Sequence, residues 1–326
     1  MMTPRERFIK ALRREPIQGH VPHFELVMFL TMEAIGRIHP LHRDYSQWYQ
    51  MSAAERRLHL VDMAKAYIET AEKYHHSAIF VHPNPGPNGE MPDDIESTRA
   101  ILETIRELSG DTYFLMIHGD PTYPIPTGDT MMEFSTMMYE EPEKIHDGTK
   151  RNVEFAQKLC DEMHKHPGLL DGWALCSDYC FNVNPFYSRD MFAEFVQPYL
   201  KEILDYYRAN GYYSIKHTDG NVMPILDMIV DCGPDAVHSL DPQGGVDLAE
   251  AKRLYGDRVC LIGNVNCGLM QTGTEEELVE DVRRALRQGM PGYGYIFSTS
   301  NCAFTGLELK RYELMNKIWW EEGIYQ

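Results

Sequence analysis

The residues best suited to chemistry lie in one short run, His-Thr-Asp-Gly-Asn at positions 217–221. The run follows a β-branched and aromatic segment, 212–215, whose composition favours a β-strand. At the end of a strand, His217 and Asp219 are two residues apart, so their side chains lie on the same side of the chain. An imidazole and a carboxylate in that arrangement can bind a metal ion or transfer a proton. This strand end is therefore the centre of a candidate site.

Polar side chains of similar kinds recur wherever an apolar run gives way to a loop. Each of them alone is more often a structural residue or a helix cap than a functional group. Taken together, residues at the ends of so many strands must face a common polar site. The set comprises Glu25, His82, His118, Asp120, Cys176, Asp178, His217, Asp219, His238, Asp241, Asn264, Asn266, Ser298, Ser300, Asn301 and Cys302.

Strand-like apolar runs alternate with segments of helical periodicity through most of the chain. We predict strands at 21–28, 77–82, 112–118, 169–175, 212–217, 236–240, 259–263 and 293–297. We predict helices at 61–75, 94–108, 144–164, 188–210, 222–232, 248–255, 274–288 and 307–322. The alternation indicates a parallel sheet, and eight units predict a (β/α)8 TIM barrel of the α/β class. An open doubly wound sheet is the alternative, but no GxGxxG turn follows an early strand.

Residues 1–20 and 29–60 are predicted to be N-terminal helical additions to the barrel. No Ser/Gly-rich linker, internal repeat or low-complexity segment divides the chain, and 326 residues can bury a substantial core. We therefore predict a single domain over residues 1–326. In such a barrel the C-terminal strand ends converge on the active site.

Composition excludes several classes of partner. The 31 basic and 49 acidic side chains give a formal net charge of -18, which repels nucleic acid and anionic lipid. No run of about 18 uncharged apolar residues is present, so no membrane span is expected. The N-terminus carries charge where a signal peptide needs an apolar core, so we expect a cytoplasmic protein. Seven cysteines without a CxxC pair argue against a disulfide framework and against a zinc ribbon.

Three strand-end residues form a candidate metal site, namely His217, Asp219 and Cys302. Cys302 follows the last predicted strand, 302 − 217 = 85 positions after His217, and the two loops can meet above the barrel axis. A His/Asp/Cys set with an open position suits catalytic zinc better than a closed structural site. The alternative is a site without metal, in which Asp219 acts as an acid or a base.

A series of motifs, in order along the chain, resembles the uroporphyrinogen decarboxylase-like superfamily, which includes zinc-dependent, corrinoid-linked methyltransferases. The resemblance covers nearly the whole chain and implies a (β/α)8 barrel. The motifs are PRERFxxALRREP at 4–16 with VP at 21–22, PFYS at 185–188, FxEFVxPY at 192–199, HTDGN at 217–221, AVH at 236–238 with DP at 241–242, YGDRVCLIGN at 255–264, GxGYI at 292–296 and SN at 300–301.

The resemblance is closer to the methyltransferase branch than to the true decarboxylases. The decarboxylases carry an Arg-Gln-Ala-Gly-Arg segment whose arginines bind substrate carboxylates, whereas the comparable place here, 32–37, keeps only Arg37. The methyltransferases hold zinc with a His-x-Cys pair on strand five and a cysteine after strand eight. This chain has His217 and Cys302 in the matching places and Asp219 instead of the intervening cysteine.

The resemblance implies an enzyme that moves a methyl group between a corrinoid cofactor and a small-molecule acceptor or donor. It implies zinc as a cofactor and a methylcorrinoid, such as methylcobalamin, carried as co-substrate by a partner corrinoid protein; a homodimer is expected on the same ground. The alternatives are a metal-free decarboxylase of a porphyrinogen or another carboxylated compound, and a non-catalytic tetrapyrrole- or corrinoid-binding protein. The residues expected to act are, for catalysis, Asp219, Glu25, Asp178 and His238; for substrate binding, Tyr179, Asn264, Asn266, His118 and Asn301; and for metal binding, His217, Asp219 and Cys302.

Overall fold

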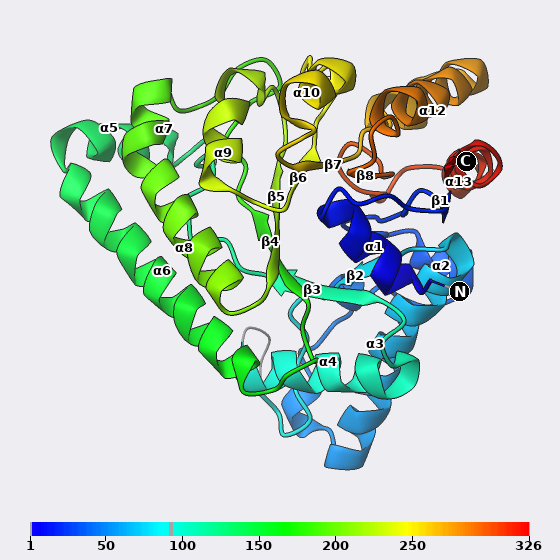
Figure 1. The fold of residues 1–326 in the computed structure, drawn as a ribbon. Helices are drawn as coiled ribbons and strands as arrows, with labels where there is room; N and C mark the ends of the chain where they lie inside the picture. Colours follow the sequence, from blue (N-terminus) through cyan, green and yellow to red (C-terminus); the bar gives the residue numbers. More distant parts are fainter. Residues whose placement is uncertain (1, 91–93, 326) are drawn as a thin grey trace.

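The computed structural model describes residues 2–90 and 94–325. Seven parallel strands form one curled sheet in the order of the chain, and helices surround it (Figure 1). This arrangement confirms the predicted TIM-barrel class. The strands are β2 (Ala78–Phe80), β3 (Phe114–His118), β4 (Gly172–Cys176), β5 (Tyr213–Thr218), β6 (Ala236–Ser239), β7 (Cys260–Ile262) and β8 (Tyr295–Ile296).

An irregular segment closes the barrel between β8 and β2. The backbone of His23 forms parallel bridges with His76, just before β2, and with Phe297, just after β8. The N–H of Phe297 donates to the carbonyl oxygen of Pro22 at 2.9 Å. The prediction of a continuous strand over 21–28 is therefore wrong in extent. Its physical reason is that Pro22 has no N–H to give to a ladder, so pairing is reduced to single bridges.

A small second sheet joins the two ends of the described chain. In it β1 (Gly19–His20) pairs antiparallel with β9 (Ile324–Tyr325), so the termini lie on the same side of the molecule (Figure 1). The helices are α1 (Pro4–Leu12), α2 (Thr31–Ile35), α3 (Ala53–Tyr74), α4 (Ile95–Ser109), α5 (Met131–Glu140), α6 (Pro142–His164), α7 (Arg189–Phe195), α8 (Gln197–Ala209), α9 (Leu226–Cys232), α10 (Leu248–Tyr255), α11 (Cys267–Thr272), α12 (Glu275–Gly289) and α13 (Leu309–Glu322), with short 3-10 helices at Pro40–His42, Trp48–Gln50 and Met223–Ile225.

The single helix predicted over 188–210 is in fact two helices. It breaks at Val196, whose backbone φ is -118°, and α8 begins with Pro198 in its first turn. Proline lacks the N–H that would continue the first helix and its ring clashes with the preceding turn, so the chain restarts instead of passing through. The sequence contained this signal, but the apolar periodicity continues across the break and hides it.

The barrel interior is closed at its N-terminal end by α1. Phe8 and Leu12 of this helix belong to one buried cluster with Ala174, Ile215 and Ala236, which are register partners on the neighbouring strands β4, β5 and β6. A capping box at the start of α1 satisfies its first N–H groups. The residues directly before and after these positions along each strand face the surrounding helices, because side chains alternate along a strand.

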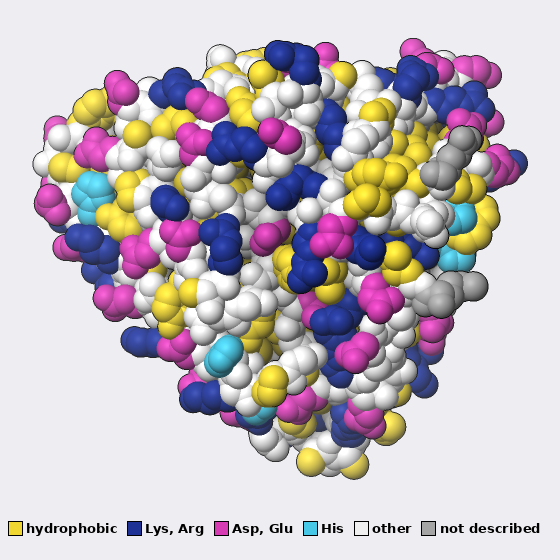
Figure 2. Space-filling view, in the orientation of Figure 1, with side chains coloured by type: hydrophobic (Ala, Val, Ile, Leu, Met, Phe, Trp, Pro, Cys, Tyr) yellow, Lys and Arg dark blue, Asp and Glu magenta, His cyan; other side chains and the backbone are white. Residues whose placement is uncertain are grey.

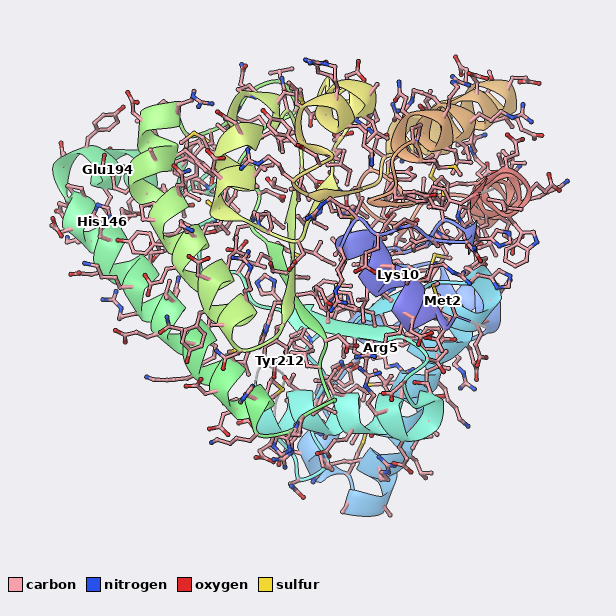
Figure 3. The ribbon with its side chains drawn as sticks, in the orientation of Figure 1. Met2, Arg5, Lys10, His146, Glu194 and Tyr212 are labelled. Carbon is pink, nitrogen blue, oxygen red and sulfur yellow. The ribbon has the colours of Figure 1, made fainter. Side chains whose placement is uncertain are left out.

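An ion pair ties α1 to the barrel. Arg5, labelled on α1 in Figure 3, donates from Nε to the Asp171 carboxylate at 3.0 Å and so ties the helix to the residue that precedes β4.

Basic and acidic side chains are interspersed over the face shown in Figure 2, without a large field of one sign. Within residues 2–90 and 94–325, none of the helices combines the length and hydropathy that crossing a bilayer requires.

Three buried imidazoles make the stability depend on pH. Burial lowers the pKa of His39 to about 3 and of His82 to about 4, and it lowers the pKa of His76 well below its usual value. The unfolded chain therefore binds more protons than the folded chain below about pH 6.5. We expect the free energy of unfolding, measured with urea, to fall as the pH drops from about 6.5 towards about 4, with each imidazole adding up to about 1.4 kcal/mol per pH unit.

A histidine variant tests the assignment. His82→Asn should make the fall shallower by about one proton, because it removes one of the buried imidazoles. An unfolding free energy that is flat over this range in the wild type would contradict the prediction.

Candidate functional site

The register of three neighbouring strands brings polar side chains together at the C-terminal end of the barrel. Cys176 of β4 is the partner of His217 in β5, and His217 is the partner of His238 in β6. His217 and His238 are both buried. The parallel register thus places three strand-end side chains in one row, and the loops after β4 and β5 add carboxylates beside them.

Asp178, His217 and Asp219 form the candidate metal centre. One ligand atom from each lies within 4.8 Å of the other two. His217 Nε2 is 3.6 Å from Asp219 Oδ1 and 3.8 Å from Asp178 Oδ1. These separations are too long for hydrogen bonds. They are close to the distance of about 3.3–3.5 Å that separates two ligand atoms of a tetrahedral zinc ion with bonds of about 2.0–2.2 Å.

Gly220 allows the two acidic loops to meet. Its φ is +78°, and a Cβ atom added there would collide with the backbone carbonyl of Phe181. Glycine adopts this conformation without steric cost and lets two backbones approach closely. The N–H of Asp219 then donates to Asp178 Oδ1 at 2.9 Å, which holds the two carboxylates side by side.

A chain of hydrogen bonds determines the tautomer of His217. The contact between His238 Nε2 and the Thr299 carbonyl oxygen, at 3.3 Å, requires His238 to donate from Nε2. Burial, and then the neighbouring His217, lower the pKa of His238 well below its usual value, so the ring is neutral and its Nδ1 is an acceptor. His217 Nδ1 lies 2.8 Å from that atom and must be the donor. The lone pair of His217 Nε2 is then directed to the two carboxylates, as a metal ligand requires.

Two further side chains hold Asp219. Ser239 Oγ donates to Asp219 Oδ1 at 2.8 Å, and the Asn301 amide donates to Asp219 Oδ2. Burial raises the pKa of Asp219, although His217 opposes this effect. A bound cation would favour the charged carboxylate and reverse the direction of the shift.

His238 acts on the candidate metal centre through His217, so we expect it to be a positioning residue. His238→Phe removes the acceptor of the His217 Nδ1–H, and we expect the affinity for zinc to fall by about 10- to 100-fold. The measurement is a competition titration against a chromogenic chelator, with thermal unfolding of the apo-protein as a control for folding. Unchanged zinc affinity in a folded variant would rule out this role.

A cavity of about 230 Å³ lies beside Asp219. Asp241 is a second carboxylate in its wall, and burial raises the pKa of this group. No Lys or Arg of the described chain belongs to the wall. The lining residues are Asn182, Asp219, Asp241, Gln243, Cys267, Gly268, Gln271, Ser300, Asn301 and Phe304. The cavity is therefore acidic and rich in amide and hydroxyl groups.

The expected metal ligands were His217, Asp219 and Cys302; the structure brings Asp178, and not Cys302, into one group with His217 and Asp219. Cys302 is half-buried, and burial raises the pKa of its thiol. Its carbonyl oxygen lies 3.8 Å from Cys267 Sγ. Asp178, which we expected in catalysis, is the third member of the group with His217 and Asp219.

Three of the residues expected to bind substrate have structural contacts instead. Asn264 is fully buried and donates to the Leu240 carbonyl oxygen at 2.7 Å, while Asn266 caps α11. The Tyr179 hydroxyl is fully buried, 2.6 Å from Thr122 Oγ1. Asn264 and Tyr179 are thus buried, whereas Asn266 is half-buried and its side-chain oxygen accepts from the first N–H groups of α11. Strand-end and cap positions look alike in sequence, so the sequence alone did not separate these roles.

The remaining expected residues are divided. Asn301 contacts Asp219 as described, and His118 is exposed at the end of β3. Glu25 is buried away from the group of three and accepts hydrogen bonds from Thr299. Sequence reasoning missed Ser239, Thr299 and Lys216; the lysine had a visible signal, since it is a charged residue directly before His217 in a predicted strand.

A closed parallel barrel with an imidazole and two carboxylates at its C-terminal strand ends defines the class of (β/α)8 proteins with a polar centre at the barrel mouth. Residues 121–318 match the family model described as uroporphyrinogen decarboxylase (URO-D). The match spans well over half of the chain, and the chain belongs to this family.

Relatives of known function are distant. A uroporphyrinogen decarboxylase from Chlorobium luteolum is 29% identical over 163 residues, which are 47% of this chain and 41% of that protein. One from Shewanella loihica is 25% identical over 241 residues, or 66% of this chain and 59% of that protein. The chain thus aligns with about half the length of these curated relatives. Membership of this family indicates an enzyme.

The fold has a solved counterpart. A methyltransferase from Methanosarcina mazei superposes with a TM-score of 0.72 at 17% identity, covering 98% of this chain and 99% of that one. At that identity the likeness is evidence for the barrel fold alone.

Proposed function

We propose that this chain is a metal-dependent methyltransferase that moves a methyl group between a corrinoid, carried by a partner protein, and a small molecule. The observation that supports the proposal most is the group formed by Asp178, His217 and Asp219, next to a cavity to whose wall the described part of the chain contributes no Lys or Arg. The donor set of one imidazole and two carboxylates fits zinc with an open coordination position. It is harder than a set with thiolates and therefore suits an oxygen or nitrogen group better than a thiol.

The chain's own residues have distinct roles in this proposal. His217, Asp178 and Asp219 would hold the ion, which supplies Lewis acidity to a bound acceptor when present. His238 and Ser239 keep two of those ligands in position. The cavity beside Asp219 orients the small molecule. Methyl transfer needs an in-line approach of nucleophile and carbon, so this positioning would supply much of the rate.

The charges argue against a porphyrinogen as substrate. A polyanionic substrate needs several cationic partners, and the cavity wall offers carboxylates instead. Arg37, the one arginine retained from the decarboxylase segment, already forms a bidentate pair with Glu69 at 2.7 and 2.8 Å. It also contacts Asp62. This guanidinium is therefore neutralised within the protein.

The test is single-turnover demethylation of methylcobalamin by the zinc-loaded protein with a panel of alcohols, amines and thiols, followed by the absorption change of the corrinoid. We expect turnover with an oxygen or nitrogen acceptor and none with the Asp178→Asn variant. Methylcobalamin that stays unchanged with every acceptor, and with a methyl donor plus reduced cobalamin in the reverse direction, would refute the proposal.

Decarboxylation is the second candidate, and the family match favours it. In that case Asp219, whose pKa is raised by burial, would serve as the acid or base without a metal. Release of carbon dioxide from uroporphyrinogen by metal-free protein would decide for the decarboxylase.

A further inference from the structure

The cavity beside the candidate metal centre has an unusual balance of charge. Asp219 and Asp241 follow β5 and β6 and stand in its wall, and no lysine or arginine of the described chain lines it. The ring of Phe304 belongs to the same wall. At about 230 Å³ the cavity is smaller than the pockets of about 300–1,000 Å³ that enclose drug-sized ligands, so it suits a molecule of few non-hydrogen atoms.

The three carboxylates at this end of the barrel lack a permanent cationic partner. Among the described residues, the one basic side chain in ion-pair contact with Asp178 and Asp219 is His217, and Asp241 has no such contact. Three buried carboxylates elsewhere in the protein are paired with cations, namely Asp171 with Arg5 and Arg106, Asp120 with Lys216, and Asp281 with Arg284. The missing counter-charge is therefore a feature of the barrel mouth.

Asp241 is the carboxylate that a bound metal ion would leave without a counter-charge. Asp178 and Asp219 carry two negative charges, which balance a zinc ion at the candidate metal centre, and Asp241 lies outside that group. Burial raises the pKa of Asp241, but hydrogen bonds from Gln243 N, at 3.0 Å to Oδ1, and from the Ser300 hydroxyl favour its charged form. A partly buried negative charge without a partner is costly, so a cation in the cavity would offset it.

The sign of the charge at the mouth is the same with and without metal. Three ionised carboxylates sum to -3, and a zinc ion changes the sum to 2 − 3 = −1. Burial raises the pKa of Asp219, His217 lowers it in part, and the nearby charges of Asp178 and Asp241 raise it further. The cavity thus favours a positively charged molecule in both states.

The character of the wall points to an organic cation. The face of an aromatic ring such as that of Phe304 attracts an ammonium group. A second metal ion fits less well, because in the described chain Asp241 belongs to no group of three His, Cys, Asp or Glu ligand atoms. Amide and hydroxyl groups of the wall can bond to the polar substituents of an organic molecule.

We propose that the small molecule bound in this cavity is an organic cation with an ammonium nitrogen, held by Asp241 and the ring of Phe304. Amino alcohols and methylated amines belong to this class. The inference rests on the proposed function in that it takes the cavity as the small-molecule site, and it makes Asp241 the residue that selects for charge.

The test compares choline with 3,3-dimethylbutan-1-ol, a neutral molecule of the same shape in which carbon replaces the charged nitrogen. Saturation-transfer NMR at constant ionic strength gives the two dissociation constants for the full-length protein, metal-free and zinc-loaded. We expect choline to bind roughly 10-fold more tightly in both forms, and sodium chloride to reduce the difference. Equal affinities, or tighter binding of the neutral alcohol, would overturn the proposal.

Variants assign the preference to the cavity wall. Asp241→Asn should weaken choline binding about 10-fold and leave the neutral alcohol unchanged, which also shows that the cavity is intact. Phe304→Leu should weaken choline more than the alcohol. Glu276→Gln removes an exposed carboxylate on α12 and should keep the preference. A preference for choline that persists in Asp241→Asn would mean that the cation binds elsewhere and would overturn the assignment.

The binding test and the methyl-transfer assay can fail separately. A protein that prefers choline but transfers no methyl group in either direction would refute the proposed function and keep the cationic site. Methyl transfer without any preference for choline would refute the cationic site alone.

Discussion

The His217→Ala protein is expected to retain its fold and to bind zinc far more weakly than the wild type. The imidazole is the one nitrogen ligand in the group of three. Its removal leaves the carboxylates of Asp178 and Asp219, whose loops are linked by the hydrogen bond from Asp219 N to Asp178 Oδ1. We expect zinc, about one ion per chain in the wild type, to bind at least about 100-fold more weakly. Methyl transfer should fall by about 1,000-fold or more, because in our proposal the bound ion lowers the activation barrier by several kcal/mol. Elemental analysis and the methylcobalamin assay measure the two effects.

The control variants separate two possible ligand sets. Asp178→Asn should weaken zinc binding nearly as much as His217→Ala, because Asp178 lies within the group. Cys302→Ser should bind zinc as tightly as the wild type, since Cys302 lies outside the group of three. The reverse result, with metal lost in Cys302→Ser and kept in Asp178→Asn, would restore the ligand set expected from the sequence.

The second large effect concerns stability and the buried ion pair of Lys216 and Asp120. Their side chains are fully buried, with Nζ 2.7 Å from Oδ2. Lys216 also donates to the Ser177 carbonyl oxygen at 2.8 Å and lies over the Tyr179 ring. Burial alone would raise the pKa of Asp120, but the charge and hydrogen bonds of Lys216, with those of Thr122, outweigh it and lower the pKa. Lys216→Met should therefore cost about 3–5 kcal/mol, because it leaves an unpaired buried carboxylate.

Urea denaturation near pH 7 measures this loss, and two variants control it. Lys201→Met breaks the exposed pair of Lys201 and Asp205 on α8 and should cost no more than about 0.5 kcal/mol. The double variant Lys216→Met/Asp120→Asn should recover part of the stability, since it removes the unpaired charge. The Asp120 contribution is present above about pH 4 and is lost as the pH falls through the lowered pKa of the folded state. A cost below about 1 kcal/mol for Lys216→Met would contradict the argument.

Some elements were predictable and others were not. The run that ends in His217 and Asp219 was identified as a strand end from composition alone, and the structure has β5 there. The helix over 188–210 and the strand over 21–28 were wrong in extent, because Pro198 and Pro22 act against an apolar pattern that continues past them. Tertiary context and single backbone restrictions override periodicity at such points.

The candidate site divides in a similar way. That polar groups converge at the C-terminal strand ends follows from the topology of any barrel of this kind. Which of them meet depends on strand register and loop conformation. The positive φ of Gly220 lets the two loops approach, so that Asp219 N can donate to Asp178 Oδ1. The amide of Asn264 donates to the Leu240 carbonyl oxygen and is therefore used inside the protein.

The sequence by itself therefore determined the alternation of strands and helices, the barrel and the strand ends that bear chemistry, since these follow from side-chain period and local propensity. The packing of the barrel brings Asp178, and not Cys302, next to His217, and it places His238 at hydrogen-bond distance from the His217 ring. The physical reason is that such contacts join residues far apart in the chain, and distances of a few ångströms between them are settled by the packing of the whole barrel.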